Sequence, residues 1–166
     1  VMPPIGLGYL AAALRQGGFD EVIILDCVKE GLSFNGFRGF LERLKPRIVG
    51  FQVFSYDFDS VVKSIEIVKQ LNHETKVLIG GAHVSATSAL ALEEIKQADY
   101  GFVGEGEIGL PMLVGRILRD EHIPLENIPG LIWRENSSIR ENNRTGVGDL
   151  DSLGFQPWDL MPPASY

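Results

Sequence analysis

The sequence contains very little cysteine and no long hydrophobic run. Its 166 residues include one cysteine, Cys27, which cannot close an intrachain disulfide or hold an iron–sulfur cluster alone. We interpret Cys27 as a structural residue of a protein in the reducing cytoplasm, and we predict no metal ligand in this chain. No apolar stretch approaches the ~20 residues of a transmembrane helix. These absences exclude a disulfide framework and a membrane partner.

Positive charge is also scarce. The chain has 15 Lys and Arg against 22 Asp and Glu, which gives a net charge of −7. Because nucleic-acid-binding faces are basic, this balance excludes nucleic acid as a partner. The remaining composition, with 45% hydrophobic and 22% charged residues, is typical of a globular domain with a real core.

Short apolar runs alternate with amphipathic segments through residue 120. The runs predict strands at 21–26, 47–54, 76–81 and 99–104. Apolar residues spaced by three and four predict helices between Pro4 and Gly17 and at 37–44, 59–71, 88–97 and 110–117. This alternation predicts an α/β fold with a doubly wound parallel sheet, flavodoxin- or Rossmann-like, covered by helices on both faces.

The pattern changes after residue 120. Two short strands around a turn at 136–138 predict a C-terminal β-hairpin, and residues 145–166 are aperiodic and contain several prolines and aspartates. We expect a domain at 1–120, a hairpin extension at 121–144, and a linker at 145–166 that leads to a downstream catalytic domain.

The first predicted helix begins almost at once, with no strand before it. A doubly wound sheet normally starts with a strand that lies at its centre. We therefore expect the first strand of the sheet to lie upstream of this segment.

Polar residues and glycines follow the predicted strands at their carboxyl ends, where such sheets bind ligands. They are Ser55 and Tyr56, then Gly80, Gly81, His83 and Ser85, then Gly104, Glu105 and Gly106.

Simpler structural interpretations stand beside these candidates. A glycine pair often serves a tight turn, and Glu107 is expected to cap the next helix. A lone histidine such as His83 is more often a solvated loop residue than a metal ligand.

The order of these motifs resembles the cobalamin-binding domain found N-terminal to radical S-adenosylmethionine (SAM) enzymes. The related corrinoid domain of methionine synthase has D-x-H-x-x-G, then S-x-L, then G-G. Here Gly6 in "VMPPIG" matches the first glycine, Pro3 stands for the histidine, and Gln52 opens the segment that replaces S-x-L. Gly80 and Gly81 match the glycine pair, and "GGAHVS" and "GEGE" match the radical-enzyme branch.

The resemblance implies a bound cobalamin. Proline cannot ligate cobalt, so Pro3 implies a cofactor with its own base displaced and no histidine below the metal. The glycine pair would clear a groove for the displaced nucleotide tail, and the polar strand-end residues would contact that tail or the corrin amides.

The resemblance also implies a downstream radical SAM domain in the same chain, serving methyl transfer or radical rearrangement. The C-x-x-x-C-x-x-C motif of that domain is absent here, so a 4Fe-4S cluster and SAM are expected only in the full-length protein, and this segment is not catalytic by itself. Two alternatives remain open: a corrinoid-free structural or substrate-docking module for the same catalytic partner, and an unrelated flavodoxin-like domain.

Overall fold

Five strands form one sheet in the order β1-β2-β3-β4-β5. The computed structural model describes residues 2–146, 148 and 154–166; Val1 and part of the predicted linker lie outside them. The first three strands are parallel, and the last two form a hairpin that joins β3 in antiparallel pairing. Their bounds are β1 Ile48–Gln52, β2 Lys76–Gly80, β3 Tyr100–Phe102, β4 Leu131–Glu135 and β5 Ser138–Glu141.

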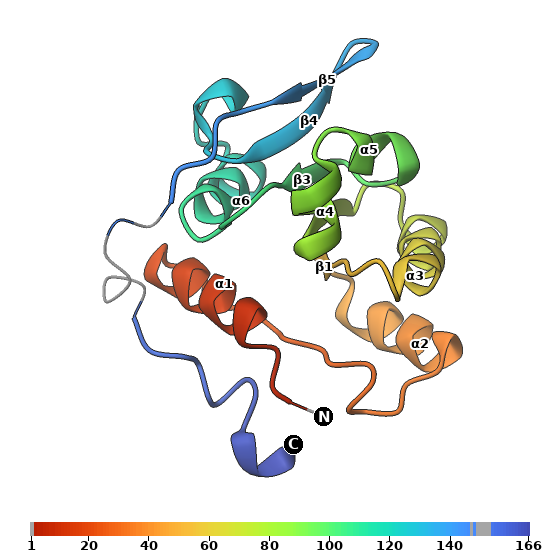
Figure 1. Cartoon of the computed structure of the whole chain (residues 1–166). Coiled ribbons are helices and arrows are strands. Elements are labelled where there is room, and N and C mark those ends of the chain that lie inside the picture. The colour runs from red at the N-terminus through yellow and green to blue at the C-terminus, as the bar shows by residue number, and fades with distance from the viewer. Residues whose placement is uncertain (1, 147, 149–153) are drawn as a thin grey trace.

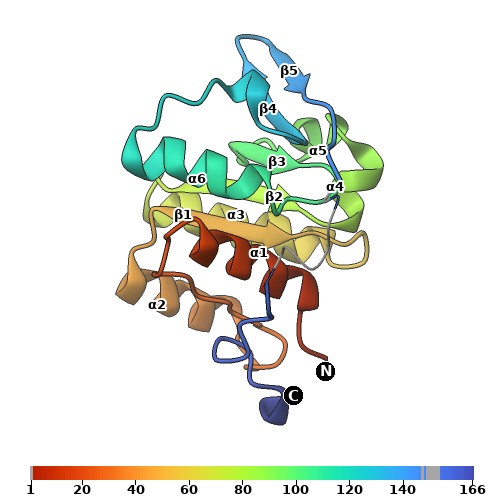
Figure 2. The same ribbon diagram turned by 90° about the vertical axis from the view of Figure 1, so that its left-hand side faces the viewer.

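Helices cover both faces of this sheet, as predicted (Figures 1 and 2). One face carries α1 (Ile5–Gln16) and α6 (Gly109–Arg119), and the other carries α2 (Phe34–Leu44), α3 (Phe58–Leu71), α4 (Ala82–Thr87) and α5 (Leu90–Glu94). Two short 3-10 helices are at Leu125–Asn127 and Pro163–Ser165. Alternate residues of β2 enter two separate cores: Val77 and Ile79 pack with α2 to α5, whereas Leu78 packs with α6. The fold class predicted from the sequence is therefore confirmed.

The strand predicted at 21–26 is not formed. Within the described residues this stretch joins no sheet, and Ile23 is 58% exposed. Leu25 and Cys27 still pack against the core on the α2 side. The segment has the side-chain pattern of a strand, and what it lacks is a neighbouring strand to pair with.

The outer edge of β1 is unpaired as well. Lys76 N–H donates to the Arg47 carbonyl and Val53 N–H donates to the Gly80 carbonyl, so odd-numbered residues of β1 face β2. The backbone groups of Ile48, Gly50 and Gln52 therefore point away from β2, and β1 is the edge of the sheet in the described part of the chain.

The helix predicted at 88–97 is shorter in the structure, because α5 covers only Leu90–Glu94. The chain enters α4 directly after Gly81, and Ser88 adopts a left-handed φ of 57° before α5 begins. The helix α4 was not predicted from the sequence, and it places His83 at the end of β2. No helix in the described residues is long and apolar enough to cross a membrane.

Residues 154–166 run along α1 toward the N-terminus, seen as the blue segment in Figures 1 and 2. Met161 is fully buried, and a Cβ placed on Gly8 of α1 would collide with Met161 and Gln156. Arg15 of α1 forms a bidentate ion pair with Asp159 at 2.9 and 2.7 Å. This part of the predicted linker is therefore packed against the domain.

Candidate ligand-binding site

The register of the parallel strands brings the predicted residues to one edge. Gln52 is the Cα partner of Gly80, and Ile79 is the partner of Gly101. The segments that follow Gln52, Gly80 and Phe102 therefore leave the sheet at the same level. All of the candidate residues after β1, β2 and β3 lie at this carboxyl edge, as the sequence predicted.

On the α1 and α6 face, the end of β2 carries no side chain. The nearest atom to a Cβ built on Gly80 would be the Phe102 carbonyl oxygen, 3.9 Å away, so the space above Gly80 is open. Gln52 lies on the same face, and a Cβ on Gly6 of α1 would be 3.4 Å from its Nε2. Gly6 and Gln52 therefore flank the open position on Gly80.

Gly50 belongs to the same face and was not singled out from the sequence. Ile48 packs with the α6 core, and strand alternation places Gly50 and Gln52 on that side. Gly50 is exposed, and no described atom lies within 4 Å of its Cβ position. An isolated glycine inside an apolar strand was the available signal, because it marks a place where something approaches the backbone closely.

Gly81 differs from Gly80. Its φ of 98° and ψ of −172° fall in a region that is essentially restricted to glycine, and its Cβ would lie 2.9 Å from the Val53 carbonyl oxygen. The tight-turn interpretation therefore accounts for Gly81, whereas no such requirement applies to Gly80.

On the opposite side of the edge, His83 links two other side chains. Its Nδ1 is 3.1 Å from the Ser55 hydroxyl, and its Nε2 is 3.2 Å from Oε2 of Glu94. The Phe58 ring lies 5.0 Å from the imidazole, whose side chain is 13% exposed. His83 is thus a fixed residue and not a solvated loop residue. No pattern in the sequence points to Glu94 or Phe58 as its partners.

Ser85 ties the second strand end to the third. Its Oγ accepts a hydrogen bond from the Gly104 amide at 3.0 Å, and its carbonyl accepts one from Arg144 at 3.2 Å. Gly104 has a φ of 81°, a backbone conformation that favours glycine. Gly106 is buried, and its Cβ position is 3.1 Å from Leu10 of α1.

The remaining candidates lie at the same edge or close to it. Tyr56 is 85% exposed and its ring stacks on Phe54 at 5.3 Å. Glu105 is exposed in the loop after β3, and Pro3 is half-buried just before α1.

The predicted cap of α6 by Glu107 is wrong. The N-cap residue is Ile108, and no side chain accepts a hydrogen bond there. Instead, Oε2 of Glu107 is buried without a hydrogen-bond partner in the described structure, as are both amide atoms of Gln156. Glu107 precedes the N-cap residue Ile108, so it does not stand at the position from which a side chain caps the first turn.

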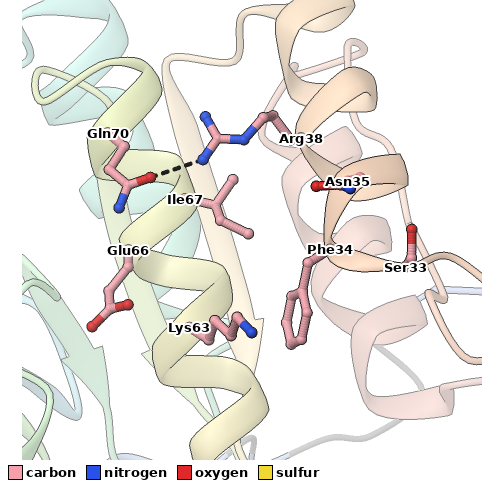
Figure 3. Close-up of a pocket in the computed structure, with 8 residues that line it drawn as sticks. All are labelled: Ser33, Phe34, Asn35, Arg38, Lys63, Glu66, Ile67 and Gln70. Carbon is pink, nitrogen blue, oxygen red and sulfur yellow. Dashed lines mark hydrogen bonds between the residues drawn. The ribbon is translucent and has the colours of Figure 1, made fainter.

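A separate groove lies between α2 and α3 (Figure 3). Arg38 donates to Gln70 at 2.8 Å across it, and the Lys63 ammonium lies 4.3 Å from the centre of the Phe34 ring. None of the residues predicted for the ligand site lines this groove.

Comparison with known protein families decides the identity of the fold. The model of the B12 binding domain matches residues 1–114. The chain belongs to the B12-binding domain family. The resemblance found in the motifs is therefore confirmed, and the alternative of an unrelated flavodoxin-like domain is excluded.

Curated relatives of this B12-binding domain are much longer proteins. It is 32% identical over 168 residues to the uncharacterized methyltransferase PH0819 of Pyrococcus horikoshii, covering 99% of this chain and 35% of that protein. It is 28% identical to the cytidylyl-2-hydroxyethylphosphonate methyltransferase of Streptomyces wedmorensis, covering 93% of this chain and 36% of the relative. The chain thus spans about a third of the length of these relatives.

Solved structures share the fold. The cobalamin-dependent SAM radical enzyme OxsB, with aqua-cobalamin and SAM bound, matches with a TM-score of 0.73 at 20% identity. That match covers 86% of this chain and 20% of OxsB. The radical SAM methyltransferase TsrM from Kitasatospora setae, with cobalamin and a [4Fe-4S] cluster bound, matches with a TM-score of 0.73 at 22% identity. It covers 90% of this chain and 27% of TsrM.

Proposed function

We propose that this domain binds cobalamin across the carboxyl edge of its sheet and presents it to a radical SAM domain of the same protein. The cofactor is held with its dimethylbenzimidazole base displaced and with no histidine below cobalt. The reaction is a methyl transfer or a radical rearrangement carried out by the downstream domain.

The observation that carries this proposal is the bare sheet surface at Gly50 and Gly80. A Cβ on Gly50 would contact nothing within 4 Å, and one on Gly80 would reach only a backbone oxygen at 3.9 Å. Neither glycine has a positive φ, so backbone conformation does not require glycine at these positions. The absence of side chains is explained by a guest that lies directly on the sheet, such as an extended nucleotide tail.

The polar groups near this surface fit such a guest. Cobalamin carries amide side chains and a nucleotide phosphate, which need hydrogen-bonding partners at the edge of the sheet. Gln52 beside Gly80 offers both a donor and an acceptor, and the Ser55 hydroxyl and the exposed Tyr56 lie in the loop that follows β1.

The positions of the three histidines support the absence of a histidine ligand. Pro3 occupies the place of the ligating histidine and has no free ring nitrogen. His73 and His122 lie in loops after α3 and α6, and His83 uses both ring nitrogens in hydrogen bonds. When bound, the corrinoid would supply a cobalt centre able to carry a methyl group, and axial ligation is one lever over such a centre.

The choice of partner rests on the relatives. Two curated relatives are named methyltransferases, and OxsB and TsrM are named radical SAM enzymes. A domain of the full-length protein that follows residue 166 would supply the 4Fe-4S cluster and bind SAM.

Cofactor retention tests the proposal. The full-length protein is incubated with hydroxocobalamin, desalted, and examined by absorption spectroscopy. We expect about one corrinoid per chain with a base-off spectrum. A colourless protein with normal circular dichroism would overturn the proposal and favour the corrinoid-free docking module.

A further inference from the structure

We propose that Glu94 and His83 are positioning residues that fix the Ser55 hydroxyl as a hydrogen-bond acceptor for an amide N–H of the corrinoid. This inference rests on the proposed function. It adds the direction of one hydrogen bond, in which the corrinoid amide donates and Ser55 accepts. The three side chains come from α5, α4 and the loop after β1.

The position of the His83 imidazole is fixed by contacts that do not depend on its tautomer. Its backbone N–H donates to the Val53 carbonyl at 3.1 Å, and its carbonyl accepts from the Thr87 hydroxyl at 2.9 Å. The Phe58 ring lies against the imidazole at 5.0 Å with a tilt of 51°. These contacts fix the orientation of the ring, so that Nδ1 faces Ser55 and Nε2 faces Glu94.

The hydrogen bond to Glu94 selects one tautomer of His83. An ionised carboxylate can only accept hydrogen bonds, so the imidazole nitrogen 3.2 Å from Glu94 must carry a hydrogen. That nitrogen is Nε2. A neutral imidazole has one N–H, so Nδ1 is left as an acceptor.

This tautomer decides the polarity of Ser55. The Ser55 hydroxyl lies 3.1 Å from Nδ1 and must donate its only hydrogen there. Its oxygen then offers only lone pairs to a ligand at the edge. Ser55 is exposed, so these lone pairs are available to an amide N–H of a corrin side chain, and they would repel a carboxylate.

The tautomer can be measured without cofactor. Nitrogen-15 NMR of histidine-labelled protein is expected to show His83 as the Nε2–H form. Glu94→Leu should abolish this preference, whereas Glu94→Gln keeps an oxygen acceptor and should retain it. Glu93→Leu removes the same charge one residue earlier on α5 and is the matched control. We call the hydrogen-bonded chain from Glu94 through His83 to Ser55 the relay. Wild-type protein with the hydrogen on Nδ1 would overturn it.

Affinity then tests the role of the relay in binding, using hydroxocobalamin titrated into the full-length protein. Loss of one hydrogen bond in Ser55→Ala is expected to weaken binding by about tenfold. Glu94→Leu should weaken it severalfold, and the double variant should bind no more weakly than Ser55→Ala, because the two residues act through one contact. Wild-type affinity in Glu94→Leu would contradict the proposal.

Cobalamin monocarboxylates, in which one side-chain amide is replaced by a carboxylate, identify the donor. We expect wild-type protein to discriminate by at least about tenfold against one of them, and Ser55→Ala to lose that discrimination. Equal binding of every derivative would overturn the assignment of an amide donor. If wild-type protein retains no cobalamin at all, the proposed function fails together with this contact, while the tautomer measurement still decides whether the relay exists.

Discussion

Gln52 and Gly80 are direct partners at the last paired position of β1 and β2. Positions 53 to 79 separate them in the sequence, yet they form one surface at the carboxyl edge of the sheet. One residue offers an amide side chain and the other offers none. We propose that this pairing of a polar group with a bare backbone suits the edge to a large ligand.

Filling the bare position should remove the cofactor without unfolding the protein. We expect Gly80→Leu to lose cobalamin retention, because the side chain occupies the proposed groove and meets no atom closer than 3.9 Å at its Cβ. Gly39→Leu is the control, since Gly39 on α2 also has open space. Retention at wild-type stoichiometry in Gly80→Leu would show that the groove is assigned wrongly.

The neighbouring glycine should respond differently. Gly81→Ala places a Cβ 2.9 Å from the Val53 carbonyl oxygen at a φ of 98°. We expect the free energy of unfolding to fall by about 2 kcal/mol, measured by urea denaturation, because both strain and a backbone collision act. Gly80→Ala serves as the comparison and should change stability far less. Equal effects of the two variants would contradict this distinction.

Cys27 should react slowly with alkylating reagents. Burial and the neighbouring Asp26 carboxylate raise the pKa of its thiol above the ordinary value. Because the thiolate is the reactive form, the rate of alkylation should rise only at a higher pH than for a cysteine peptide.

Asp26→Asn separates the two causes of this shift. The Asp26 Oδ1 accepts the Val28 and Lys29 amides at 3.1 and 2.9 Å, and an asparagine oxygen can replace it there. We expect the variant to react faster at a given pH because the negative charge is gone. An unchanged rate profile would leave burial as the whole cause.

The C-terminal segment should depend on one ion pair. The hydrogen bonds from Arg15 lower the pKa of Asp159, so the pair stabilises the packed segment above the ordinary carboxyl pKa. This contribution is lost as the pH falls through the lowered value in the folded state. Limited proteolysis of Asp159→Asn should cut residues 154–166 faster, with Asp120→Asn as the control. Equal cleavage of both variants would mean that apolar packing of Met161 is sufficient.

Hydrogen exchange should reveal the unpaired edge of β1. We expect fast exchange of the amides of Ile48, Gly50 and Gln52 and slow exchange of Val49 and Phe51, which face β2. Slow exchange of Ile48, Gly50 and Gln52 would contradict this arrangement.

Much of the fold was predictable because its signals are local. Apolar runs at 47–54 and 76–81, helical spacing in 59–71, and glycines after the strands depend only on neighbouring residues. These features predicted the alternation of strands and helices and the edge where the candidate residues gather. The motifs also indicated the B12-binding domain family before any geometry was available.

The errors share a physical cause. Residues 21–26 have the composition of a strand, but a strand needs a neighbour, and pairing is a property of the whole sheet. The unpredicted helix α4, the shortened helix α5 and the misplaced cap at Glu107 depend on how these helices meet the ends of β2 and β3. Local periodicity does not contain that information.

The sequence alone determined the fold class, the family and the strand ends that form the candidate site, because periodicity and motif order are written along the chain. Only the tertiary structure decided that Gly80 is open while Gly81 is required by the backbone, and that Ser55, His83 and Glu94 form one hydrogen-bonded chain. Those properties arise from contacts between residues far apart in sequence, which exist only after the strands have paired and the helices have packed.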